Sequence, residues 1–169
     1  YVDGVKVEAE YDAATGYLTP KSALGEGTHS ITYKVVNSTG NESISSKPVE
    51  ITIDTTAPTK PTTPTGFIDD EGEKKGTFEP GTETDDTTPG IIVGPLHPDE
   101  ETTLYVDGKE VESTYDPDTG ELKPTHPLPE GEHEITYTVT DGAGNKSEPS
   151  DPIVIIVDTT APEKPTTTP

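Results

Sequence analysis

The 169 residues include no Cys, Met, Trp or Arg. Without Cys the chain can form neither disulfides nor thiolate sites, and zinc would have only His and carboxylate ligands. Eleven Lys face 33 acidic residues, so the formal net charge is −22. This balance argues against nucleic-acid binding, because phosphate neutralisation needs basic side chains. It also disfavours an anionic membrane surface.

Apolar residues are scarce as well. Leu, Ile, Val and Phe number 31, or 18% of the chain. No apolar run approaches the ~20 residues of a membrane-spanning helix, so we expect no membrane insertion. Low apolar content with high net charge is by itself typical of disorder. Here the apolar residues are patterned, however, and the patterns predict a folded protein.

The chain repeats itself at an offset of 104 residues. Tyr1–Pro61 aligns without a gap with Tyr105–Pro165, and more than half of the aligned residues are identical. Asp-Thr-Thr-Ala-Pro, for example, occurs at both 54–58 and 158–162. The unit has the usual size of one domain. We therefore predict the C-terminal part of a first repeat over 1–57, a complete second repeat over 58–162, and a Pro/Thr linker over 163–169.

The start of the chain falls inside a predicted strand, because Tyr1 aligns with Tyr105. We expect the early strands of the first repeat, the counterparts of Thr59–Leu104, to be missing upstream of Tyr1. The alternative is a half-module that another chain completes. In either case the first repeat should expose apolar faces and unpaired strand edges.

The periodicity within a repeat is two, and no segment has helical period. Ile135, Tyr137 and Val139 alternate with Thr, which indicates a half-buried strand. The first copy shows the same alternation over 31–35. Asp107-Gly108 between two alternating stretches is a hairpin signal. Further strands are predicted at 89–94 and 152–157, with a split first strand at 66–68 and 76–78. About seven short strands per repeat favour an all-β fold, an antiparallel immunoglobulin-like sandwich, here in linear tandem.

Five motifs occur in one order at repeat spacing: Asp54-Thr-Thr-Ala-Pro, Asp69-Asp-Glu-Gly, Thr84-Asp-Asp-Thr-Thr-Pro, Tyr105-Val-Asp-Gly and Asp141-Gly-Ala-Gly-Asn. That order resembles the bacterial Ig-like tandem repeats of giant surface adhesins and biofilm-associated proteins. The resemblance implies a seven-stranded sandwich, an extracellular location at the bacterial cell surface, a stalk of many copies, and calcium at or near module junctions. The first copy departs from it at Asn37, which replaces the acid of Asp141.

Calcium is the expected cofactor, because hard cations take oxygen ligands and the chain is rich in them. In an Ig-like sandwich Asp54 should lie beside the loops that begin the next module, including Asp141–Asn145. Asp85 and Asp86 should lie near Asp158, where the chain leaves the module. The alternative is that these acids only stabilise turns. The candidate calcium ligands are Asp54, Asp69, Asp70, Asp85, Asp86, Asp141 and Asp158.

Other candidate sites have weaker support. Asp116–Glu121 resembles the start of an acidic calcium loop, but a turn explains better what both copies share. The four His show no metal-ligand spacing, and no nucleophile lies in a strand–turn–helix elbow. We therefore predict no catalytic residues.

The leading hypothesis is a structural repeat of an adhesin stalk, with neighbouring repeats of the same chain as its partners. A host or surface ligand would be contacted by other parts of the parent protein. Two alternatives stay open: a ligand-binding tip module, or an accessory domain of a secreted enzyme. A tip should show a long inserted loop or an aromatic patch, and neither copy shows one.

Overall fold

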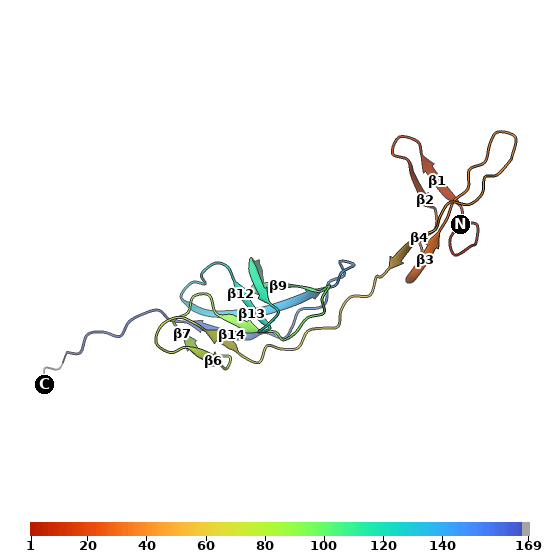
Figure 1. The fold of residues 1–169 in the computed structure, drawn as a ribbon. Helices are drawn as coiled ribbons and strands as arrows, with labels where there is room; N and C mark the ends of the chain where they lie inside the picture. Colours follow the sequence, from red (N-terminus) through yellow and green to blue (C-terminus); the bar gives the residue numbers. More distant parts are fainter. Residues whose placement is uncertain (167–169) are drawn as a thin grey trace. The chain divides into compact units, whose positions relative to one another are not determined.

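The computed structural model describes residues 1–166. They form two compact units, Tyr1–Thr56 (unit 1) and a second that begins at Ala57 (unit 2). The regular structure of both units is β (Figure 1). Within the described residues no helix is long and apolar enough to cross a membrane.

Unit 2 consists of two five-stranded sheets. The first has the order β10 (Lys109–Val111), β9 (Glu101–Val106), β13 (Gly131–Thr140), β14 (Ile153–Val157) and β7 (Glu83–Thr84). The second has the order β11 (Ser113–Asp116), β12 (Glu121–Pro124), β8 (Gly90–Ile92), β5 (Phe67–Asp69) and β6 (Gly76–Phe78). Neighbouring strands are antiparallel, except that β14 and β7 are parallel. The predicted all-β class is confirmed.

The core of unit 2 lies between these sheets, because both contribute inward side chains. Strand β13 alternates as predicted, and Ile135, Tyr137 and Val139 are buried. From the other sheet Phe67 and Ile91 are buried at the same core. Its remaining buried members are Leu104, Val106, Leu122, Leu128, Ile153, Ile155 and Val157.

Up to residue 166, where the description ends, unit 2 has ten strands, whereas about seven were predicted. Strands β5 and β6 are not the halves of one split strand. They form a hairpin in which Phe67 pairs with Phe78, the ring centroids lying 5.9 Å apart. The crossing to the other sheet is made instead by β7, which pairs with the last strand. Another division falls at Glu112, which separates β10 from β11 in different sheets.

The Asp-Gly hairpin signal is confirmed in unit 2. Asp107 has φ 50° and Gly108 has φ 73°, so both central residues occupy the left-handed region that a type I′ turn requires. This turn sets the register in which Lys109 pairs with Val106. Asp3 and Gly4 repeat the geometry in unit 1.

Unit 1 consists of two separate hairpin-like sheets. Strand β1 (Ala9–Asp12) pairs with β2 (Tyr17–Pro20), and β3 (Gly27–Ile31) pairs with β4 (Val49–Ile53). The alternating strand predicted over 31–35 is wrong beyond Ile31. In unit 2 the equivalent residues 136–140 pair with 101–105 of β9. Within unit 1 only Tyr1 corresponds to that stretch, so residues 33–35 have no strand beside them.

Candidate functional site

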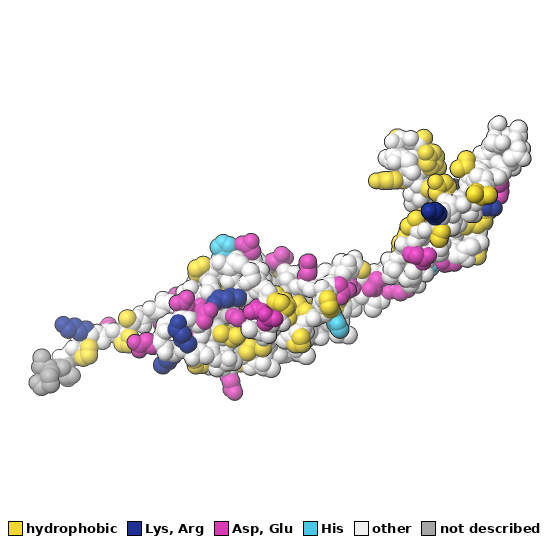
Figure 2. Space-filling view, viewed as in Figure 1, with side chains coloured by type: hydrophobic (Ala, Val, Ile, Leu, Met, Phe, Trp, Pro, Cys, Tyr) yellow, Lys and Arg dark blue, Asp and Glu magenta, His cyan; other side chains and the backbone are white. Residues whose placement is uncertain are grey.

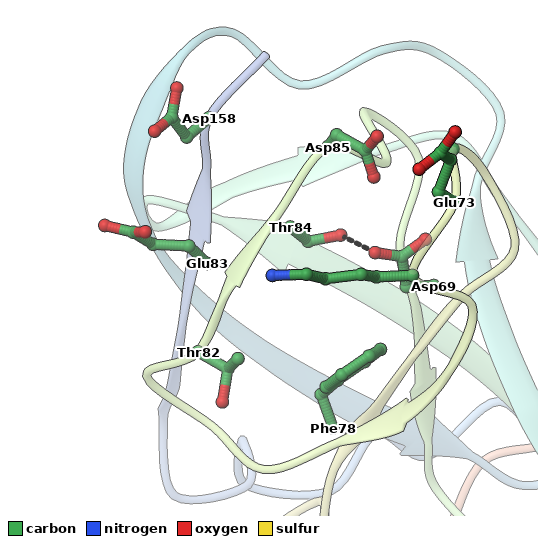
Figure 3. Close-up of a pocket in the computed structure, with 10 residues that line it drawn as sticks. Asp69, Glu73, Phe78, Thr82, Glu83, Thr84, Asp85 and Asp158 are labelled. Atoms are coloured by element: carbon green, nitrogen blue, oxygen red, sulfur yellow. Dashed lines mark hydrogen bonds between the residues drawn. The ribbon is translucent and has the colours of Figure 1, made fainter. Parts of the chain in front are cut away.

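An acidic groove of 530 Å³ lies where the chain leaves unit 2. Asp69, at the end of β5, and Asp85, just after β7, line it together with Asp158, which follows β14. Glu73 and Glu83 line the same groove (Figure 3). Lys74 is its one basic residue. The predicted proximity of Asp85 to Asp158 is confirmed, because parallel pairing of β7 with β14 ends both strands at one pole.

Two candidate ligands of this region are buried and already hydrogen-bonded. The Asp69 carboxylate accepts from the Thr84 hydroxyl at 2.6 Å, as Figure 3 shows. The Asp86 carboxylate, 0% exposed, accepts from the backbone N–H of Thr88 at 2.7 Å and of Asp70 at 3.3 Å. These bonds tie the loop after β5 to the loop after β7. Both side chains therefore have a structural role, because they fix the loops beside the groove.

Asp70 points to a different partner. Its carboxylate accepts from the Lys123 ammonium at 2.7 Å, and this hydrogen bond lowers the pKa of Asp70. The pair links the β5 loop to β12 across one sheet. Both groups are partly exposed, so the contribution to stability is modest.

The remaining candidates, Asp54 of unit 1 and Asp141 of unit 2, are not among the residues that line the groove. Asp141 accepts from the backbone N–H of Ala143 and Asn145, and hydrogen bonding with Asn145 lowers its pKa. In unit 1 the side-chain oxygen of Asn37 accepts the equivalent hydrogen bonds, from the backbone N–H of Thr39 and Asn41. An uncharged Asn performs the identical task, so turn stabilisation is sufficient to explain this position. Asp54 likewise accepts from the Thr56 N–H at 3.0 Å.

The turn interpretation of Asp116–Glu121 agrees with the structure. Asp116 accepts from the Asp118 N–H at 2.9 Å, and this bond lowers its pKa. Gly120, at φ 71°, closes the β11–β12 hairpin. Within residues 1–166 no three side chains of His, Asp or Glu converge closely enough to hold a metal ion.

A glutamate clamp fixes the segment that leaves each unit. Glu130 accepts from the hydroxyls of Thr159 at 2.7 Å and Thr160 at 2.6 Å, and also from the Thr159 N–H. The Thr160 and Thr159 hydroxyls lower the pKa of Glu130. In unit 1, Glu26 holds Thr55 and Thr56 in the same way. The clamp is therefore repeated in both units, and in unit 1 it forms with only β3 and β4 paired beside it.

A second set of contacts fixes the segment that begins unit 2. The Tyr137 hydroxyl donates to the carbonyl oxygen of Thr62 at 3.0 Å. Lys60 forms an ion pair with Asp151, and Pro64 is buried. The stretch 58–65, which its composition marks as linker, is therefore attached to the sandwich at Lys60, Thr62 and Pro64.

A histidine, His133, bridges the hairpin turn to the loop before β13. In His133, Nδ1 lies 2.8 Å from the Asp107 carboxylate and Nε2 lies 2.8 Å from the Pro129 carbonyl oxygen. Both partners only accept, so the ring can donate to both of them at once only when it is protonated. Burial of the ring opposes its charge, but the bonds to Asp107 and Pro129 outweigh it and raise the pKa of His133. Unit 1 repeats the bridge with His29 and Asp3.

We expect this bridge to make the stability of unit 2 depend on pH. A His whose folded pKa is raised stabilises fully below its unfolded pKa of ~6.5. That stability is lost as pH rises through the folded pKa. His133→Gln should therefore lower the free energy of unfolding most near pH 6 and progressively less toward pH 9. Urea unfolding at a series of pH values measures this. The exposed His126 is the matched control, and an equal pH profile for His126→Gln would contradict the bridge.

We did not predict the clamp, the bridge or two of the groove acids from the sequence. A signal for the first two was present, because Glu26, His29 and Asp3 are all retained at Glu130, His133 and Asp107. Their partners lie 26 to 30 residues away along the chain. Glu73 and Glu83 carry no such signal, because the first copy has no counterpart of either.

The two packed sheets of unit 2 define an Ig-like β-sandwich module. The family of bacterial Ig-like domains matches residues 62–159, more than half of the chain, and the chain belongs to this family. Such domains are typically non-catalytic and generally occur in surface or secreted proteins. No curated protein matches the chain.

Nine chains of solved structures match this chain. The fibronectin(III)-like modules of Clostridium thermocellum CbhA align with 93% of this chain and 76% of theirs, at 16% identity and a TM-score of 0.47. The Bacteroides ovatus mixed-linkage glucan utilization locus protein SGBP-B, in complex with a mixed-linkage heptasaccharide, aligns with 92% of this chain. That alignment spans 35% of SGBP-B at 20% identity and a TM-score of 0.30.

Proposed function

We propose that the chain is a non-catalytic spacer: two consecutive repeats from the stalk of a bacterial cell-surface adhesin. It holds a distal binding region away from the cell and so supports adhesion or biofilm formation. Its own partners are the neighbouring repeats of the same chain, and the host or surface ligand is contacted elsewhere in the parent protein.

The observation that carries the proposal is the fixing of the chain on both sides of the junction. Unit 1 holds its last residues through the Glu26 clamp on Thr55 and Thr56. Unit 2 holds its first residues from Lys60 onward. Only 57–59 lie between, and Pro58 restricts the backbone there further. A spacer requires such short free segments, because long flexible ones would let successive modules fold back.

Calcium is the second part of the proposal. The groove acids offer oxygen ligands at the pole where a following module begins, which supports binding there. They do not converge as a complete site, so carbonyls, water or another module must supply further ligands. Extracellular sites have Kd values of roughly 10⁻⁴–10⁻³ M. At ~1 mM calcium this adds only about 0.4–1.4 kcal/mol per site, so calcium stiffens the junction more than it folds the module.

The spacer is tested by the distribution of distances between the units. Because the chain has no Cys, nitroxide labels at Glu50→Cys and Glu132→Cys report one distance by pulsed electron resonance. Glu26→Ala should broaden the distribution, because it frees Thr55 and Thr56. Glu130→Ala is the matched control: it removes the same clamp beyond unit 2 and should leave the distribution unchanged.

The same labels test calcium. A narrower distribution in calcium than in chelator supports the second part of the proposal, and identical distributions would remove it. An unchanged distribution in Glu26→Ala would refute the clamp and, with it, the spacer argument.

A further inference from the structure

Every Asn of the chain stands two residues before a hydroxyl residue. The three sequences are Asn37-Ser-Thr, Asn41-Glu-Ser and Asn145-Lys-Ser. Asn-x-Ser/Thr, where x is not Pro, is the acceptor sequence for N-linked glycosylation. The sequence is short and the chain is rich in Thr, so the surroundings of each Asn decide which of them can accept a sugar.

Two of the three hydroxyls already have a structural task. Ser147 is buried, and its hydroxyl accepts from the backbone N–H of Val139 at 2.9 Å. In unit 1 the Ser43 hydroxyl accepts from the N–H of Val35 at 3.0 Å. The need to satisfy these N–H groups explains both serines. Thr39, the third hydroxyl residue, has no such strand N–H to satisfy.

The side-chain amides that precede these two serines are engaged as well. Asn145 donates from Nδ2 to the Asp141 carboxylate at 3.0 Å. Asn41 donates from Nδ2 to the Thr39 hydroxyl at 3.0 Å. A transferase would have to break these bonds before it could reach either nitrogen.

Asn37 alone presents its amide nitrogen. Its Oδ1 accepts from the hydroxyl of Thr39 at 2.8 Å and from the backbone N–H of Thr39 and Asn41. Only an oxygen can accept these three bonds, so the side-chain orientation is fixed. Within residues 1–166 its Nδ2 donates no hydrogen bond. The hydroxyl that the acceptor sequence requires therefore lies against the Asn37 side chain, whose nitrogen is left for another partner.

The turn that carries Asn37 is exposed and well defined. A bridge between Val36 and Glu42 closes it, and residues 37–41 are all exposed. Figure 2 shows the tip of this loop, which follows β3, as a surface with neither charged nor hydrophobic side chains. The equivalent turn of unit 2 is exposed over 142–144. Exposure is therefore a property of the turn itself, because the unit with two packed sheets shows it too.

Two differences between the repeats create the acceptor. Unit 2 has Asp141 and Ala143 where unit 1 has Asn37 and Thr39, so unit 2 lacks both the amide and the hydroxyl. In unit 2 the second carboxylate oxygen of Asp141 takes the amide of Asn145. The amide nitrogen of Asn37 cannot accept in this way. The amide of Asn41, the equivalent of Asn145, turns to the new Thr39 hydroxyl instead.

We propose that Asn37 is a site of N-linked glycosylation and takes its sugar from a phosphate-activated sugar donor. A bond forms between Nδ2 and C1 of the sugar as the bond between C1 and the phosphate oxygen breaks. The phosphate leaves with that electron pair, and Nδ2 loses one proton to a base of the transferase. The carbonyl oxygen of Asn37 stays an acceptor, so the turn survives the modification. The site does not depend on the spacer function.

The folded 169-residue chain is the substrate for the first test. It is incubated with a purified asparagine glycosyltransferase specific for Asn-x-Ser/Thr and with a uridine-diphosphate hexose. Mass spectrometry should find one hexose, on Asn37. Asn37→Gln should abolish the modification, and Thr39→Ala should slow it by about tenfold or more. Ser38→Ala is the matched control and should keep the wild-type rate, because the middle position of the sequence is variable.

Two further substrates separate the structure from the preference of the enzyme. Unfolded synthetic peptides 33–47 and 139–151 should accept a hexose at all three Asn, whereas the folded chain accepts at Asn37 alone. The double variant Asp141→Asn, Ala143→Thr gives unit 2 the same turn. It should gain a second hexose at position 141, with circular dichroism confirming that the variant is folded.

Three outcomes of these assays would overturn the proposal. They are a folded chain that takes no hexose, equal modification of Asn41 or Asn145 in the folded chain, and a wild-type rate in Thr39→Ala. Protein isolated from the cells that make it gives the last test. Its proteolytic fragment containing Asn37 should be heavier by at least one sugar, and a fragment found only at its unmodified mass would refute the site.

Discussion

Ile155→Ala should destabilise unit 2 by about 2–5 kcal/mol, whereas Ile51→Ala should have a far smaller effect. The two residues hold the same repeat position, and each lies opposite the bridging histidine of its unit. Ile155 is 1% exposed in the core and Ile51 is 41% exposed. Removing a buried isoleucine loses transfer free energy and leaves a cavity, whereas at the exposed position little cavity forms.

Urea unfolding gives the change in free energy and thermal unfolding gives the change in melting temperature, both followed by circular dichroism. At ~4–8 °C per kcal/mol for a domain of this size, the melting temperature of Ile155→Ala should fall by at least ~8 °C. Equal shifts in the two variants would show that the units bury this position alike. A melting temperature of Ile155→Ala within a degree of wild type would place the side chain outside the core.

The periodicity of the sequence predicts the strands whose partners are present. In β13 the alternation of Ile135, Tyr137 and Val139 is matched by burial. The same pattern fails at Tyr33 and Val35, because a strand exists only with a neighbour to pair with, and periodicity says nothing about that neighbour. The prediction that Gly76–Phe78 continues the strand at 66–68 was wrong for a related reason. Its residues are typical of a strand, but whether it continues β5 or reverses along it depends on packing between Phe67 and Phe78.

In the candidate site, too, some features could be predicted from the sequence and others could not. Topology was enough to place Asp85 near Asp158, because the last strand and the strand beside it end at one pole. Burial was not predictable for two adjacent acids: Asp86 is inside and Asp85 outside. Which of them turns inward depends on the N–H groups of Thr88 and Asp70. One of these comes from a loop 16 residues earlier in the chain, and no local pattern marks it.

These neighbouring acids give the second prediction. Asp86→Ala should lower the free energy of unfolding of unit 2 by about 2–4 kcal/mol, because it leaves the N–H groups of Thr88 and Asp70 without their acceptor. Asp85→Ala should stay within ~0.5 kcal/mol of wild type in chelator, since its exposed carboxylate lies in the acidic groove. The matched pair changes one carboxylate each, at adjacent positions.

Repeating both unfolding series in calcium separates structural from ligand roles. If Asp86 only ties the two loops together, its substitution costs the same with calcium as with chelator. If Asp85 contributes an oxygen to a bound ion, Asp85→Ala removes the calcium-dependent part of the stability while leaving the calcium-free part intact. A calcium-dependent loss in Asp86→Ala alone would reverse these assignments, because it would require the buried carboxylate to leave Thr88 and turn toward the ion.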